Sequence, residues 1–308
     1  MINSCIKFCN FENINFIKMS NLKGLGVALV TPFNEDLSVD FDSLTKLVNF
    51  NIENGTNYLV VLGTTAEAAT LSSEEKKQVT DHIVKVNNKR VPLVLGIGGN
   101  NTMEVKKQIE ETDLSDFDAV LSVSPYYNKP NQEGLYQHYK ALASTGKNII
   151  IYNVPSRTGQ NLEASTTLRL AKEFPNLIMI KEAAPNILQY FDILRLKPAN
   201  FNLVSGDDEY TLPVTLAGGN GVISVIGQGY PKEFSTMVQL AFEGKVKEAY
   251  EIHNKLVEIT RLIFAEGNPA GIKTVLAEKG IIKNYLRLPL VAASAGLQEK
   301  IKAEMAKI

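Results

Sequence analysis

Leu177-Ile178-Met179-Ile180-Lys181-Glu182 is a short apolar run that ends in two charged residues. Pro175-Asn176 precedes it and Ala183-Ala184-Pro185 follows it, so the run is typical of a strand buried on both faces of a parallel sheet. Lys181 would then stand at the C-terminal end of this strand. Burial lowers the pKa of a lysine because desolvation disfavours the charged form, and a neutral amine can form a Schiff base with a carbonyl group. A lysine whose amine extends into water is the alternative.

Similar apolar runs alternate with amphipathic helical stretches from Gly24 onward, a pattern typical of repeated βα units. We expect eight strands, at residues 24–30, 57–62, 91–97, 118–123, 148–154, 177–181, 201–205 and 221–226. The helices between them are expected at residues 41–53, 73–87, 103–114, 133–144, 162–173, 187–195, 209–217 and 232–242. Eight units favour a closed α/β barrel, the (β/α)8 TIM barrel, over an open doubly wound sheet. No glycine-rich dinucleotide turn follows the first strand.

Helix-start signals and the end of the strand pattern complete this organisation. Ser72 with Glu75 and, at the next helix, Thr102 are predicted to be capping residues. After Gly244 the sequence predicts no strand, and we expect a C-terminal helical appendage of three helices, at residues 245–264, 269–279 and 289–306. The predicted domains are a catalytic barrel at residues 19–244 and a helical domain at residues 245–308. Residues 1–18 are expected to be a disordered extension before Met19.

Composition excludes several functional classes. The chain has 308 residues, a formal net charge of −1 and 21% charged residues, which argues against nucleic acid as a partner. No apolar run approaches the roughly 18 residues of a membrane span. Cys5 and Cys9 lack the further ligands of a zinc site, so we expect free thiols and a cytoplasmic protein.

Polar residues gather at the C-terminal ends of the predicted strands and in the loops after them, which form the active-site rim of such barrels. They are Gly63-Thr64-Thr65-Ala66-Glu67, Gly98-Gly99-Asn100, Tyr126-Tyr127, Tyr152 with Arg157, Lys181-Glu182 and Ser205-Gly206-Asp207-Asp208. Taken one at a time, Thr64 and Thr65 could form a turn, Tyr152 could be a core aromatic and Asp207-Asp208 could cap the seventh helix. Those separate roles do not explain why so many polar residues are predicted to lie at one rim.

These residue types suit Schiff-base chemistry. A neutral Lys181 would attack a keto acid, and hydroxyl groups of Tyr152, Thr64 and Tyr127 could relay protons, because a hydroxyl both donates and accepts. Arg157 offers a planar fork that suits a carboxylate. The histidines, His82, His138 and His253, fall on predicted helices away from the rim, which argues against a Ser-His-Asp triad or a His-ligated metal. We therefore expect no metal and no cofactor.

Six motifs in order give the chain a family resemblance over residues 22–308. They are Val30-Thr31-Pro32-Phe33, Gly63-Thr64-Thr65-Ala66-Glu67, Pro125-Tyr126-Tyr127-Asn128, Tyr152-Asn153-Val154-Pro155-Ser156-Arg157-Thr158-Gly159, Ile180-Lys181-Glu182 and Gly221-Val222-Ile223-Ser224. The sequence resembles the dihydrodipicolinate synthase branch of the pyruvate-dependent class I aldolase superfamily, which also contains N-acetylneuraminate lyase. This resemblance implies condensation of pyruvate with L-aspartate 4-semialdehyde, giving 4-hydroxy-tetrahydrodipicolinate on the diaminopimelate route to lysine.

The resemblance also implies a role for each matching residue. Lys181 would form the Schiff base with pyruvate, Tyr152 would act as general acid and base, and Thr64 and Tyr127 would complete the proton relay. Tyr127 is contributed across a subunit interface in that family, whose usual assembly is a homotetramer. The substrate-binding residues implied are Thr65 with Gly206 and Ile223 for pyruvate, and Arg157 for the carboxylate of the semialdehyde.

Two departures from the family pattern matter. The family turn usually has glycine where this chain has Ala66, at a position where the φ angle could be constrained. In the lysine-feedback site Asn100, Glu104 and Tyr126 match, but Lys76 replaces a histidine and another position is Ser73. Cationic Lys76 would repel the ammonium group of a lysine effector, which predicts weak or absent inhibition.

Two other functions remain open from the sequence. Another pyruvate-dependent aldolase, such as N-acetylneuraminate lyase, would share Lys181 and Tyr152 but lack the Ser156-Arg157 pair. A barrel that binds a keto acid without catalysis would not need its polar residues to share one rim.

Overall fold

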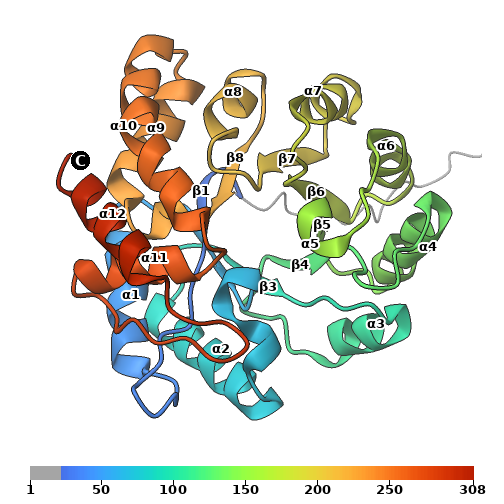
Figure 1. Ribbon diagram of the computed structural model, residues 1–308. Coiled ribbons are helices and arrows are strands. Elements are labelled where there is room, and N and C mark those ends of the chain that lie inside the picture. The colour runs from blue at the N-terminus through green and yellow to red at the C-terminus, as the bar shows by residue number, and fades with distance from the viewer. Residues whose placement is uncertain (1–21) are drawn as a thin grey trace, which may run out of the picture.

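Eight parallel strands close into a barrel in the computed structural model, which describes residues 22–308 (Figure 1). The predictions for residues 1–18, including Cys5 and Cys9, and for Met19 lie outside the described residues. The strands are β1 (Gly24–Ala28), β2 (Tyr58–Val61), β3 (Leu93–Gly96), β4 (Ala119–Val123), β5 (Ile149–Asn153), β6 (Leu177–Glu182), β7 (Asn202–Ser205) and β8 (Gly221–Ser224). Pairing of Gly24 with Gly221 closes the barrel between β1 and β8. The predicted TIM barrel is confirmed.

Helices surround the barrel and continue into a C-terminal group (Figure 1). They are α1 (Phe41–Glu53), α2 (Ser73–Asn87), α3 (Thr102–Glu111), α4 (Gln132–Ala143), α5 (Pro155–Thr158), α6 (Ala164–Glu173), α7 (Ile187–Leu196), α8 (Thr211–Leu216), α9 (Pro231–Phe242), α10 (Val246–Phe264), α11 (Ala270–Glu278) and α12 (Ala295–Met305). Short 3₁₀ helices are η1 (Thr64–Ala66), η2 (Ala68–Thr70) and η3 (Ile226–Gln228). Each predicted strand and helix is found, with ends that shift by a few residues.

The strands bury side chains on both faces, as their apolar runs predict. Alternate residues fill the barrel interior, among them Tyr58, Ile150 and Ile223, while the intervening residues pack beneath the helices. A Cβ at Gly26 would lie 2.2 Å from the Tyr58 ring, so glycine is needed for this aromatic ring to cross the interior. The Tyr58 hydroxyl is satisfied by Val222 O at 3.0 Å.

The two predicted helix caps had different outcomes. Ser72 and Glu75 form the predicted capping box at the start of α2. The prediction that Thr102 caps the next helix is wrong, because the cap is Asn101, whose side chain accepts from Met103 N at 3.2 Å. The Thr102 hydroxyl instead lies 2.9 Å from His138 Nδ1.

The C-terminal group has the three predicted helices, but the last is shorter than expected. The predicted start of this helix at residue 289 is wrong, because α12 begins at Ala295 after the N-cap Ser294. Ser294 is fixed there because its Oγ and N bond to the Glu266 carboxylate at 2.5 and 2.7 Å. The division of the chain into domains at residue 244 stays a prediction.

Residues 280–294, here called the C-terminal strap, connect α11 to α12 and lie against the start of α2. Arg287 of the strap pairs with Glu75 at 2.5 Å and donates to Leu37 O at 2.7 Å. The strap therefore passes the side of the barrel where β2 ends, because Arg287 N also donates to Glu67 Oε2 at 3.0 Å. Within residues 22–308, no helix combines the length and apolar character that a membrane crossing requires.

Candidate active site

Lys181 and Tyr152 are neighbours on β6 and β5. The two residues are paired in the strand register, and Lys181 Nζ lies 4.3 Å from the centroid of the Tyr152 ring. Lys181 is only 5% exposed and Tyr152 7% exposed. The alternative of a lysine that extends into water is thus wrong, and the amine lies against an aromatic face inside the rim.

The next residues of the same strands, Asn153 and Glu182, lie on the opposite side of the sheet because side chains alternate along a strand. The Glu182 carboxylate accepts from Asn153 Nδ2 at 2.9 Å, Gln189 Nε2 at 2.9 Å and Ala184 N at 2.7 Å. Burial raises the pKa of Glu182 to about 7, although these donors oppose the rise. This network joins β5, β6 and α7 directly behind Tyr152 and Lys181, and no role was predicted for it from the sequence.

Gly206 follows β7 and packs against Lys181. A Cβ at this position would lie 2.9 Å from Lys181 Cε and 2.8 Å from Ala183 Cβ. The Gly206 amide donates to Glu182 O at 2.6 Å. Glycine is thus required by the close approach to the lysine stem. Ile223 of β8 is fully buried in the barrel interior.

Thr64 and Thr65 begin the rim turn, defined here as residues 64–67. The turn is a 3₁₀ helix whose left-handed residue is Glu67, with a φ of 54°. Ala66 lies within the 3₁₀ helix, so its methyl group meets no left-handed backbone, and the expected constraint at this position is not found. Thr65 Oγ1 accepts from Asn268 Nδ2 at 2.9 Å.

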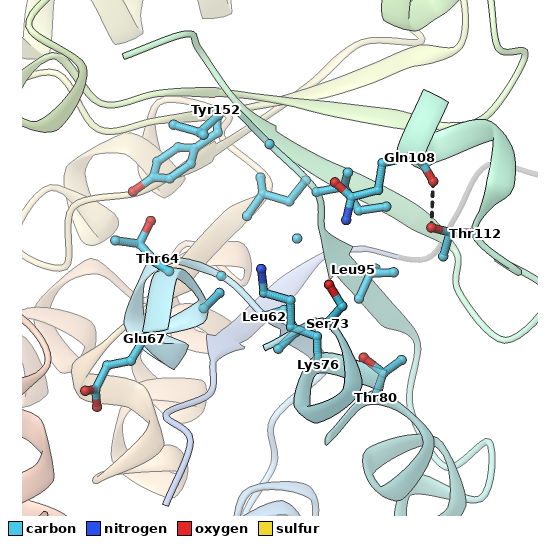
Figure 2. Close-up of a pocket in the computed structure, with 18 of the residues that line it drawn as sticks. Leu62, Thr64, Glu67, Ser73, Lys76, Thr80, Leu95, Gln108, Thr112 and Tyr152 are labelled. Carbon is cyan, nitrogen blue, oxygen red and sulfur yellow. Dashed lines mark hydrogen bonds between the residues drawn. The ribbon is translucent and has the colours of Figure 1, made fainter. Parts of the chain in front are cut away.

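A cavity of about 1540 Å³ opens beside the rim turn. Thr64, Tyr152 and Arg157 line it, and Figure 2 shows the hydroxyl groups of Thr64 and Tyr152 pointing toward one another. Lys181, Thr65, Gly206 and Ile223 are not part of this lining. Tyr152 therefore contacts both the cavity and the buried amine of Lys181.

The cavity continues from the rim toward α2 and α3. Lys76, Glu104 and Tyr126 of the predicted effector set line it, and Lys76 appears around the same opening in Figure 2. Asn100 is absent from the lining, but its Nδ2 donates to Tyr126 O at 3.2 Å. Two of the predicted catalytic residues, Thr64 and Tyr152, therefore line the same cavity as three of the predicted effector residues.

Tyr127 is not brought to the other predicted catalytic residues. Its side chain is 89% exposed and its φ is 74°, in the left-handed region that non-glycine residues rarely adopt. The neighbouring Asn128 Nδ2 donates to Asn100 O at 3.0 Å, which fixes the loop after β4. The contribution of Tyr127 to a second subunit stays a prediction.

Arg157 lies in α5, directly after β5. Its backbone N donates to Val154 O at 2.9 Å, and its side chain lines the cavity. Within residues 22–308, no carboxylate forms an ion pair with Arg157. The guanidinium is therefore available to an anionic ligand in the cavity.

Asp207 and Asp208 do not form the simple helix cap that was one explanation for them. Asp207 Oδ1 accepts from Glu209 N and Tyr210 N, in the turn that precedes α8. Asp208 Oδ2 accepts from Val225 N and Ile226 N, both at 3.1 Å. Burial raises the pKa of Asp208 to about 6. Asp208 thus ties the loop after β7 to the loop after β8.

The described part of the chain contains no cluster of side chains suited to bind a metal ion. Among residues 22–308, no group of three or more His, Cys, Asp or Glu side chains is arranged to hold an ion.

Comparison with known proteins identifies the family of this barrel. Residues 21–308 match the model of the dihydrodipicolinate synthetase family. A 4-hydroxy-tetrahydrodipicolinate synthase of Flavobacterium psychrophilum is 56% identical over 279 residues, which cover 90% of this chain and 95% of the relative. Its counterpart in Parabacteroides distasonis is 54% identical over 283 residues, covering 92% and 95% of the two chains.

A solved structure has the same fold. The chloride-inhibited dihydrodipicolinate synthase of Acinetobacter baumannii, crystallised in complex with pyruvate, superimposes with a TM-score of 0.89 at 40% identity. The match covers 92% of this chain and 98% of that one. The chain belongs to the dihydrodipicolinate synthetase family.

Proposed function

We propose that this protein condenses pyruvate with L-aspartate 4-semialdehyde to give 4-hydroxy-tetrahydrodipicolinate. The observation that carries the proposal is the buried amine of Lys181, held 4.3 Å from the Tyr152 ring at the rim of the barrel. The two relatives at 56% and 54% identity are named for this reaction. The alternative of an N-acetylneuraminate lyase is not favoured by these relatives.

Lys181 Nζ would attack the keto carbon of pyruvate, and loss of water would leave an iminium. The iminium withdraws electrons, so a proton leaves the neighbouring methyl carbon and an enamine forms. The enamine carbon then attacks the aldehyde carbon of the semialdehyde, whose oxygen takes up a proton. Attack by the amine of the condensed substrate on the iminium carbon closes the ring and releases Lys181.

Proton transfer in these steps is assigned to hydroxyl groups. Tyr152 is the general acid and base beside Lys181, and Thr64 passes the proton onward, in keeping with their facing hydroxyls in Figure 2. Tyr127 of a second copy of the chain would complete the relay, in a homotetramer. The 89% exposure of Tyr127 supports this assignment, since the side chain is free to reach a neighbour.

Two carboxylates need binding groups. The hydroxyl and backbone of Thr65 would hold the carboxylate of pyruvate, with the main chain of Gly206 and Ile223 enclosing its other side. Arg157 would hold the carboxylate of the semialdehyde through its planar fork. The absence of an ion-pair partner for Arg157 within residues 22–308 supports that role.

An effector site is proposed at the α2 and α3 end of the cavity. Asn100, Glu104, Tyr126 and Lys76 would form it, and the cation of Lys76 would weaken binding of lysine. We further propose that the enzyme works in the cytoplasm.

The experiment that tests the function measures pyruvate consumption by the purified protein. One reaction contains L-aspartate 4-semialdehyde, a second contains N-acetylmannosamine and a third contains no aldehyde. The proposal expects consumption only with the semialdehyde. Turnover with the sugar aldehyde alone would contradict the substrate assignment, and consumption in neither reaction would contradict the enzyme assignment.

A further inference from the structure

Three residues of the C-terminal segment contact two residues of the rim turn. Asn268 Nδ2 donates to Thr65 Oγ1 at 2.9 Å across 203 residues of sequence. Lys273 Nζ pairs with Glu67 Oε1 at 2.5 Å, and both side chains are fully buried. Arg287 N donates to Glu67 Oε2 at 3.0 Å. Both Thr65 and Glu67 are therefore held by residues outside the barrel strands and their connecting helices.

The side chain of Asn268 points toward the rim turn rather than toward the C-terminal helices. The residue precedes α11, is 9% exposed and lines the cavity. Its Oδ1 is buried and has no partner among residues 22–308. The hydrogen bond to Thr65 is thus the side-chain bond that fixes this amide within the described structure.

The contact constrains the hydrogen of the Thr65 hydroxyl. A hydroxyl group has one hydrogen and two lone pairs, and the amide nitrogen of asparagine only donates. Since Asn268 Nδ2 occupies a lone pair of Thr65 Oγ1, the hydroxyl hydrogen must point elsewhere. Thr65 is 3% exposed, and a buried donor without an acceptor is unfavourable. A carboxylate, which only accepts, would complete this arrangement.

We propose that Asn268 is a positioning residue that keeps the Thr65 hydroxyl a hydrogen-bond donor to the carboxylate of the keto-acid substrate. This inference rests on the proposed function, in which Thr65 binds pyruvate. Asn268 acts through Thr65, so its loss weakens pyruvate binding and leaves the proton relay of Tyr152 and Thr64 in place. The ion pair of Glu67 with Lys273 holds the other end of the rim turn while Asn268 orients the hydroxyl.

A double-mutant cycle tests the inference. The variants are Asn268→Ala, Thr65→Val, which keeps the shape of threonine without its hydroxyl, and the two combined. The readout is the pyruvate concentration that half-saturates borohydride trapping at Lys181, with kcat for the condensation as a second readout. Asn268→Ala is expected to raise half-saturating pyruvate about three- to tenfold, the effect of one hydrogen bond, with a smaller change in kcat. The combined variant is expected to match Thr65→Val alone.

Two further variants keep the result interpretable. Asn268→Asp is expected to raise half-saturating pyruvate more than Asn268→Ala does, because its carboxylate would accept the Thr65 hydrogen and repel the substrate anion. This variant carries the test if Asn268→Ala does not fold. Asn284→Ala is the matched control, since Asn284 lies in the C-terminal strap and bonds to Thr274 Oγ1, away from the rim turn. Its trapping curve is expected to be that of the wild type.

Three outcomes would overturn the inference. One is an unchanged half-saturating pyruvate in folded Asn268→Ala, and another is a further loss when Asn268→Ala is added to Thr65→Val. The third is an equal loss in Asn284→Ala, which would indicate general damage to the C-terminal segment. Wild-type protein that pyruvate and borohydride do not modify would instead refute the proposed function, and this result is distinct from the other three.

Discussion

Gly206 and Lys181 are in such close contact that a single added methyl group would overlap the lysine stem, at 2.9 Å from Cε. This contact connects the loop after β7 to the reactive residue of β6. It also means that the path of the Lys181 side chain depends on the size of a residue that carries no functional group.

Gly206→Ala is therefore expected to reduce Schiff-base formation strongly, by about tenfold or more in the trapping rate, since overpacking displaces side chains. The expected loss of stability is about 1–3 kcal/mol, measured by urea unfolding. Gly296→Ala in α12 is the control, because a Cβ there meets open space. Trapping by Gly206→Ala at the wild-type rate would contradict the importance of this contact.

Glu182 gives a pH-dependent stability with a definite sign. Its pKa rises from the ordinary value of 4.5 to about 7, so between these values the folded protein holds a proton that the unfolded chain has lost. Its contribution is fully present below pH 4.5 and is lost as the pH rises to about 7, on the order of 3 kcal/mol in all.

Urea unfolding at several pH values, for wild type and Glu182→Gln, measures this contribution. The difference between their unfolding free energies should change with pH between about 4.5 and 7 and then level off. Glu299→Gln, at a side chain that is 76% exposed, is expected to follow the wild type. Parallel curves for wild type and Glu182→Gln over this range would show that Glu182 titrates normally.

Arg157→Ala separates binding of the second substrate from formation of the Schiff base. We expect KM for L-aspartate 4-semialdehyde to rise about 10- to 100-fold, as for loss of a hydrogen-bonded charged group. Trapping of pyruvate at Lys181 should stay close to the wild-type level. Arg195→Ala removes an arginine of α7 that is 69% exposed and should change neither quantity. Loss of pyruvate trapping in Arg157→Ala would assign Arg157 to the first substrate instead.

The positive charge of Lys76 is expected to weaken inhibition by lysine. The wild-type enzyme is expected to be inhibited weakly or not at all, and Lys76→His should be inhibited more strongly because the fixed positive charge is removed. Activity titrations with lysine measure both. Full inhibition of the wild type at sub-millimolar lysine would rule out the proposed repulsion.

The barrel could be predicted from the sequence because each strand and helix is indicated by a pattern of neighbouring residues. Each strand is a short apolar run buried on two faces, and helical stretches separate the runs. The strand β6 was therefore predicted from neighbouring residues alone, to within one residue of its end at Glu182. Rim residues such as Thr64 and Tyr152 followed from their positions at or just after the C-terminal ends of strands. The prediction failed where two neighbouring residues could both cap a helix. Asn101 is the N-cap of α3, and the Thr102 hydroxyl instead bonds to His138.

Contacts between distant segments were outside the reach of such patterns. Asn268 stands before a predicted helix and Lys273 within it, and nothing nearby in the sequence indicates that they contact Thr65 and Glu67. The residues behind the site offered a weak signal, since Asn153 and Glu182 directly follow Tyr152 and Lys181. Alternation along a strand places them on the opposite face, but the hydrogen bonds between them depend on the strand register.

The most direct test of the central claim is mass analysis of the protein after treatment with pyruvate and borohydride. We predict a covalent adduct of one reduced pyruvate per chain, located at Lys181 by peptide mapping. Lys181→Met should carry no adduct and should lose activity by roughly 10³-fold or more. An adduct on another lysine, or a Lys181→Met enzyme that keeps wild-type turnover, would contradict the assignment of Lys181 as the Schiff-base residue.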